Sequence, residues 1–80
     1  MSKFEKQLNK LMSVPNDMRY EELKSILIKF GFHGYESGSS HITFRKKGYP
    51  NITIPRHGDI KKVYIMLVKD VISEVLKNEK

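Results

Sequence analysis

The sequence predicts a single α+β domain in which helices cover one face of a three-stranded antiparallel sheet. Apolar residues recur at helical spacing in three segments, at residues 4–12, 19–30 and 61–77. Between the second and third of these segments the apolar residues alternate with polar ones, which is typical of strands with one buried face. A length of 80 residues suffices for one hydrophobic core and is too short for two.

Two helices are predicted before the strands. The first has four apolar side chains on one helical face, namely Phe4, Leu8, Leu11 and Met12. The second spans about residues 19–30 and is followed by Gly31, which suits a left-handed C-cap. Its N-cap is not evident, because Arg19 stands where Ser, Thr or Asp is usual.

Three strands are predicted to form a meander, over residues 32–36, 41–46 and 51–54. Gly, Ser and Pro residues between them favour turns. Pro55 has no N–H to donate to a ladder, so the third strand is expected to end there. The closing helix, from Lys61 to about Lys77, contains neither Gly nor Pro.

The alternation in the second strand predicts which side chains face solvent. Ile42 and Phe44 can both lie under the helices only if their neighbours point to the opposite face. Those neighbours are His41, Thr43 and Arg45. We therefore expect an open face of the sheet that bears an imidazole, a hydroxyl and a guanidinium group.

The net charge of +6 is concentrated in the C-terminal half. Residues 1–40 hold six basic and five acidic side chains, whereas residues 41–80 hold nine and four. Nucleic acid is the commonest partner of such a protein, with an anionic membrane or an acidic protein as alternatives. An ordinary solvated lysine-rich face also accounts for the excess.

The composition favours a cytoplasmic protein. The chain contains no cysteine, which fits a reducing compartment. Its N-terminus is charged, and no apolar run approaches the ~20 residues that a membrane span requires. We expect neither export nor a membrane partner.

Histidine 41 suits RNA cleavage without a metal. That reaction needs a base for the 2′-hydroxyl, stabilisation of charge on the phosphoryl oxygens and protonation of the 5′-oxygen that leaves. An imidazole exchanges protons near neutral pH, and guanidinium and ammonium groups hold phosphates by charged hydrogen bonds. Any exposed histidine has this capacity, so the residues alone permit the chemistry and do not identify it.

Three linked motifs resemble those of the HicA toxins of bacterial and archaeal toxin–antitoxin systems. They are the helix end Lys29-Phe30-Gly31-Phe32, the turn Gly38-Ser39-Ser40-His41 and the strand exit Ile54-Pro55-Arg56-His57-Gly58. The resemblance covers about residues 19–77. It implies a double-stranded-RNA-binding-domain-like fold of order α-β-β-β-α, here with an extra N-terminal helix. Residues 1–15 would then form a helical extension and residues 16–80 the HicA-like domain.

The resemblance also implies an activity, a site and a partner. It makes the chain an endoribonuclease that cleaves mRNA without a metal or other cofactor, with His41 as the catalytic acid or base. A HicB-type antitoxin protein would bind the chain and cover its site. The residues predicted to bind RNA are Ser39, Thr43, Arg45, Lys46, Lys47, Arg56 and His57.

Several alternatives remain open at the level of sequence. His57 would be a second proton carrier, a phosphate contact or a cap of the last helix, and His33 is expected to be merely exposed. Tyr35 and Tyr49 would either stack on bases or pack on the sheet. Family members often have Lys-Pro-Gly before the last helix, where this chain reads Lys61-Lys62-Val63-Tyr64.

Two other functions compete with the nuclease. One is a non-catalytic binding module of the same fold, which would bind RNA and leave it intact or would be a toxin relic that only binds its antitoxin. The other is a protein-interaction adaptor whose basic face meets an acidic partner, and which would show no RNA affinity at low salt.

Overall fold

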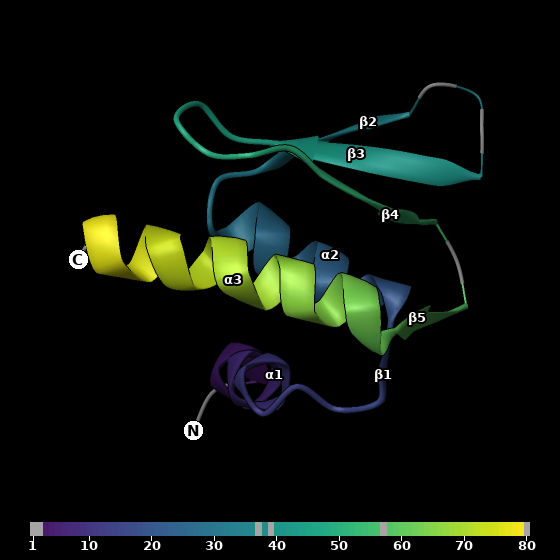
Figure 1. Ribbon diagram of the computed structural model, residues 1–80, viewed down its shortest axis with the longest axis horizontal. Helices are drawn as coiled ribbons and strands as arrows, with labels where there is room; N and C mark the ends of the chain where they lie inside the picture. The colour runs from purple at the N-terminus through teal and green to yellow at the C-terminus, as the bar shows by residue number, and fades with distance from the viewer. Residues whose placement is uncertain (1–2, 37, 39, 57, 80) are drawn as a thin grey trace.

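The computed structural model describes residues 3–36, 38, 40–56 and 58–79 and has three layers (Figure 1). The sheet β2-β3-β4 is the first layer, α2 and α3 form the second, and α1 lies beyond them. This arrangement confirms the predicted α+β class. Along the chain the elements are α1 (Lys3–Met12), β1 (Asp17–Arg19), α2 (Tyr20–Lys29), β2 (His33–Glu36), β3 (His41–Arg45), β4 (Ile52–Pro55), β5 (Asp59–Lys61) and α3 (Lys62–Asn78).

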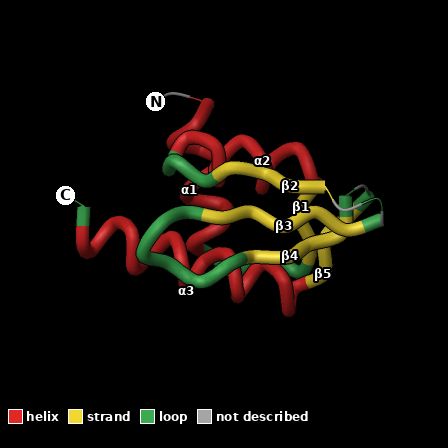
Figure 2. The backbone as a smooth tube through the Cα atoms, turned by 90° about the horizontal axis from the view of Figure 1, so that it is seen from above, coloured by secondary structure: helices red, strands yellow, loops and turns green. Residues whose placement is uncertain are grey.

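The three-stranded sheet has β3 at its centre, antiparallel to both neighbours (Figure 2). On the face toward the helices, Phe44 pairs with Gly34 on one side and with Ile52 on the other. A Cβ atom at Gly34 would lie 3.2 Å from Cε1 of Phe44 and 2.9 Å from Cδ1 of Ile42. Glycine in β2 therefore allows the strand to lie close over the apolar side chains of β3.

The helices and the helix-facing side of the sheet contribute to one core. Of the residues that the structure describes, sixteen apolar side chains are buried, among them Leu11 of α1 and Phe44 of β3, both fully inaccessible to solvent. Phe4 of α1 also packs on Phe30, with ring centroids 5.9 Å apart. Helix α1 is thus joined to the same core as the sheet. Within the described residues, no helix combines the length and the apolar character needed to cross a membrane.

A second, two-stranded sheet was not predicted. β1 pairs with β5 in antiparallel register, and Met18 lies opposite Ile60, with 1% and 0% of their surfaces exposed. Each strand has only three residues, of which one is apolar and buried. One apolar residue does not form the alternating pattern by which a strand is predicted. Because α2 and α3 begin directly after β1 and β5, this pairing holds the starts of the two helices together.

The start of α2 is stabilised by Glu22. The backbone N–H of Arg19, the N-cap, donates to Oε1 of Glu22 at 3.0 Å, in the manner of a capping box. The Nζ atom of Lys10, in α1, donates to both carboxylate oxygens of Glu22 at 3.2 Å. Burial alone would raise the pKa of Glu22, but these hydrogen bonds together lower the pKa below its ordinary value of 4.5.

Replacing Phe44 should test the burial pattern of β3. Because this ring is fully buried, Phe44→Ala is expected to lower the free energy of unfolding by about 3–5 kcal/mol. Thr43→Val, one residue away on the outer face, should cost at most about 1 kcal/mol. Urea unfolding followed by circular dichroism measures both, and equal losses would contradict the assignment of faces.

Replacing Glu22 should change how the free energy of unfolding depends on pH in the acid range. A lowered folded-state pKa means that the carboxylate stabilises the protein above pH 4.5 and loses that effect as the pH falls through the folded-state pKa. Glu22→Gln is therefore expected to cost about 1 kcal/mol at pH 7 and almost nothing at the acid end. Glu21→Gln, which removes the same charge in the same helical turn, is the control. A Glu22→Gln deficit of constant size from pH 7 to pH 3 in thermal unfolding would refute this assignment.

Candidate functional site

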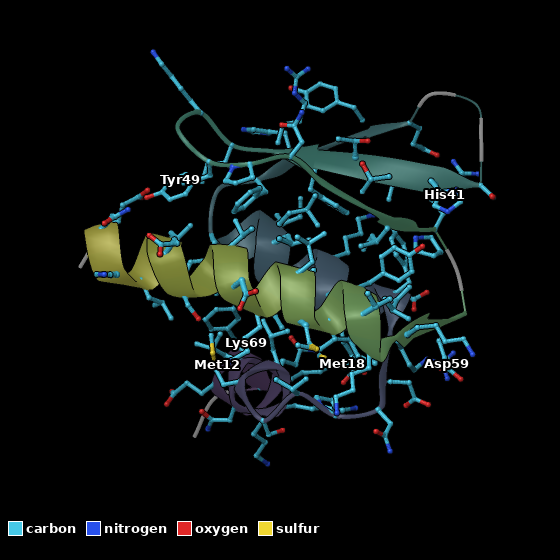
Figure 3. All side chains as sticks on the ribbon, in the orientation of Figure 1. Met12, Met18, His41, Tyr49, Asp59 and Lys69 are labelled. Carbon is cyan, nitrogen blue, oxygen red and sulfur yellow. The ribbon has the colours of Figure 1, made fainter. Side chains whose placement is uncertain are left out.

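His41 begins β3, directly after the turn that joins β2 to β3. Gly38 in that turn has a φ of +82°, a left-handed conformation that glycine adopts without steric cost. The imidazole is exposed, and its Nδ1 lies 3.5 Å from Oγ of Ser40. In Figure 3, His41 lies at the opposite end of the sheet from Tyr49. The sheet thus presents a proton-exchanging side chain at one end of its open face.

The open face is a grid of polar and aromatic side chains. Tyr35, Thr43 and Thr53 form one row across the three strands, and the two threonine hydroxyl oxygens lie 2.9 Å apart. His33 and Arg45 form the next row, and the guanidinium carbon of Arg45 lies 5.7 Å from the Tyr35 ring centroid. The outward orientation predicted for alternate residues of β3 is confirmed by its exposure pattern.

Arg56 lies beside the turn that presents His41. Its backbone N–H donates to the Ser40 carbonyl at 2.8 Å, which extends the contact between β4 and β3. Its guanidinium forms an ion pair with the carboxylate of Glu36, the last residue of β2. Burial raises the pKa of the Tyr20 phenol, and the positive charge of Arg56 opposes that rise. Arg56 is therefore held between the sheet and the start of α2.

The other predicted cations lie at the far end of β3. Arg45 lies four residue steps along the extended strand from His41, a distance of about 13 Å. Arg45, Lys46 and Lys47 line an open hollow of about 660 Å³ at this end of the sheet. The remaining residues of its wall are Gly31, His33, Tyr35, Gly48, Tyr49 and Asn51.

Lys46 differs from its two neighbours because it faces α3. Its Nζ lies 3.5 Å from Oε1 of Glu79, and only 19% of its side chain is exposed. Oε2 of the same carboxylate accepts a hydrogen bond of 2.8 Å from the Tyr49 hydroxyl. This hydrogen bond raises the pKa of Tyr49. Glu79 thus joins the end of α3 to the β3–β4 turn and neutralises one cation of the hollow.

The predicted site residues therefore form two groups. The first is His41 and the backbone of Arg56 at one end of the sheet, and the second is Arg45 to Lys47 at the other; Thr43 lies in the middle row between them. Ser39 and His57, which were also predicted to bind RNA, lie outside the described residues.

The first group has the side chains for proton transfer to or from a phosphodiester. An exposed imidazole can donate or accept a proton, whereas the Arg56 guanidinium is paired with Glu36, whose register partner Ile42 faces the helices. His33 and His41 lie at opposite ends of the sheet and do not converge. Among the described residues, no three His, Asp or Glu side chains are grouped so that they could hold a metal ion.

Two carboxylates of this region were not singled out from the sequence. Glu36 and Glu79 each neutralise a predicted RNA-binding cation, and both pairs join residues at least 20 positions apart. No local sequence pattern predicts contacts between residues so far apart. His33 was expected to be exposed, and it is; the register of β2 with β3 places it opposite Arg45.

Comparison with known proteins identifies a family for most of the chain. A family model described as the HicA toxin of bacterial toxin–antitoxin systems matches residues 20–75. This region includes all of α2, the three-stranded sheet and most of α3. No curated protein and no solved structure matches the chain.

Substitution of Gly38 should test how the turn before His41 is held. No atom lies within 4 Å of a Cβ placed at Gly38, so the cost of Gly38→Ala comes from its φ of +82° alone. We expect a loss of about 1–2 kcal/mol in the free energy of unfolding. Gly38→Asn should lose less, because asparagine enters the left-handed region more readily than alanine. Equal losses in urea unfolding would argue against this backbone conformation.

Proposed function

The chain belongs to the HicA family of toxins from bacterial toxin–antitoxin systems, and we propose that it is an endoribonuclease that cleaves mRNA with His41 as a general acid or base. The observation that supports this most strongly is the position of His41, exposed at the end of the open face and next to the backbone of Arg56. As a toxin of this family the chain has a cognate antitoxin.

The proposed reaction needs no metal or other cofactor. The 2′-oxygen attacks the adjacent phosphorus while the bond from phosphorus to the 5′-oxygen breaks, which leaves a 2′,3′-cyclic phosphate and a 5′-hydroxyl. One proton leaves the 2′-hydroxyl and one is gained by the 5′-oxygen. The imidazole of His41 performs one of these transfers, because a histidine side chain can act as either a general acid or a general base.

Arg56 is the proposed ligand of the phosphate that is cleaved. Its guanidinium is paired with Glu36, but the side chains are 36% and 55% exposed. An exposed ion pair contributes only about 0–1 kcal/mol, so a phosphate can replace the carboxylate at little cost. We propose that Thr43 adds a hydroxyl donor beside His41. Ser39 and His57 are assigned to RNA binding only through their place in the family motif.

The second group, Arg45 to Lys47, is proposed to hold the RNA backbone away from the point of cleavage. Cations that contact phosphates supply affinity that is independent of sequence and falls with salt. We further propose that the antitoxin is of the HicB type and covers the open face, which would block both groups. An mRNA substrate also places the activity in the cytoplasm.

A non-catalytic RNA-binding module is the second candidate. The hollow at the far end of β3 supports it, because Arg45 and Lys47 lie there and would bind RNA without any contribution from His41. The two candidates differ in one measurable property, which is whether the RNA is cut.

Replacing His41 tests the proposed function. His41→Ala is expected to lower the cleavage rate of a purified mRNA by about 10²–10⁴-fold, because one proton transfer loses its catalyst. Wild-type cleavage should continue in excess EDTA and yield 2′,3′-cyclic phosphate ends. Growth inhibition should be lost in the same variant while the antitoxin still copurifies with it.

Lys24→Gln is the matched control, since it removes a charge from an exposed position on α2, away from the sheet. It should cleave at the wild-type rate. If His41→Ala cleaves as fast as wild type, the assignment of His41 is wrong. If wild type binds RNA but leaves it intact, the chain is the binding module.

A further inference from the structure

We propose that the hollow lined by Tyr35, Arg45, Lys47 and Asn51, called here the Tyr35 groove, binds one nucleotide of single-stranded RNA more than one nucleotide away from the scissile phosphate. The base would stack on Tyr35, and its phosphate would contact Arg45 and Lys47. The inference rests on RNA being the substrate and not on the role of His41.

Tyr35 has the exposure and the neighbours of a stacking residue. It is a large aromatic side chain with 54% of its surface exposed, although it lies in the middle row of a sheet. Its partners across the strands are threonines, so it is not covered by an apolar neighbour in its own row. The Arg45 guanidinium lies over the ring, with its central carbon 5.7 Å from the ring centroid, and adds a cation to this surface. An aromatic ring beside a cation is the usual surface for an unpaired base and its phosphate.

The charge in the groove is available to an anion. Within the part of the chain that the structure describes, neither Arg45 nor Lys47 forms an ion pair, and both are exposed. Lys46, the cation between them in sequence, is instead neutralised by Glu79. Two cations without a carboxylate therefore share one hollow with an aromatic ring. His33 and Asn51 in the same wall offer polar atoms to the edge of a base.

Single-stranded RNA fits this arrangement better than a duplex. Bases in a duplex are covered by their neighbours in the stack, whereas an unpaired base can leave the strand and lie on an aromatic side chain. Arg45 lies about 13 Å along β3 from His41, which is longer than the step between adjacent stacked nucleotides. An RNA that occupies both places must therefore run along the sheet.

The test is a binding titration with a fluorescent single-stranded RNA in which every 2′-hydroxyl is methylated. Such an RNA is not cleaved by attack of the 2′-oxygen, so the result does not depend on which residue is catalytic. Tyr35→Leu should weaken binding by about tenfold, and Tyr35→Phe should bind like wild type because the ring remains. A duplex of the same sequence should show no dependence on Tyr35.

Charge variants test the phosphate contact. Arg45→Gln should make the dependence of log affinity on log salt shallower by about 0.7, the value for one phosphate contact in a single strand. Glu79→Gln should have the opposite effect and tighten binding, because it releases Lys46. Lys24→Gln, on α2, should change neither quantity beyond error.

Two results would overturn the proposal. The first is unchanged RNA affinity in folded Tyr35→Leu and Arg45→Gln proteins. The second is loss of antitoxin binding by these variants with RNA binding intact, which would make the groove a protein-binding surface. A failure of His41→Ala to slow cleavage would refute the proposed catalytic residue and leave these measurements unaffected.

Discussion

Burial of Ile42 and Phe44 against the helices determines the direction of every side chain on β3. Both are apolar and lie on the same face of one strand, so neither can turn outward without exposing the other. A shift of one residue in register would place His41 in the core and Phe44 in solvent, at a cost of several kcal/mol. The open face therefore follows from the packing of the closed one.

The two ends of β3 differ in what surrounds them. At the first end, the His41 turn is held by the backbone of Arg56 and lies near the start of α2. The pairing of β1 with β5 fixes the starts of α2 and α3 below it. At the second end the β3–β4 turn is joined to the end of α3 through side chains, with Glu79 as the common partner of Lys46 and Tyr49. The end with the candidate proton carrier is thus attached through backbone, and the end with the groove through flexible side chains.

Most of the fold could be predicted from the sequence, because its signals are local. The periods of 3.6 and 2 placed the long helices and the meander within about one residue, and the alternation of β3 gave the orientation of His41 and Arg45. The pairing of β1 with β5 could not be predicted, since a three-residue strand with one apolar side chain has no pattern. The division of the site into two groups could not be predicted from the sequence either. Lys46 and Arg45 are adjacent cations in the sequence, and no local pattern shows that Glu79 neutralises Lys46 but not Arg45.

Acidic residues consequently shape the basic surface as much as the basic ones do. Glu36 forms an ion pair with Arg56 at one end of the sheet, and Glu79 forms one with Lys46 at the other. Both pairs are partly exposed, so each holds its cation weakly and gives it up to a stronger anion such as a phosphate. Arg45 and Lys47 have no carboxylate partner to release, so they can bind a phosphate before the paired cations do. The net charge of +6 therefore determines the long-range attraction of a polyanion such as RNA. The positions of Glu36 and Glu79 determine which cations bind its phosphates first.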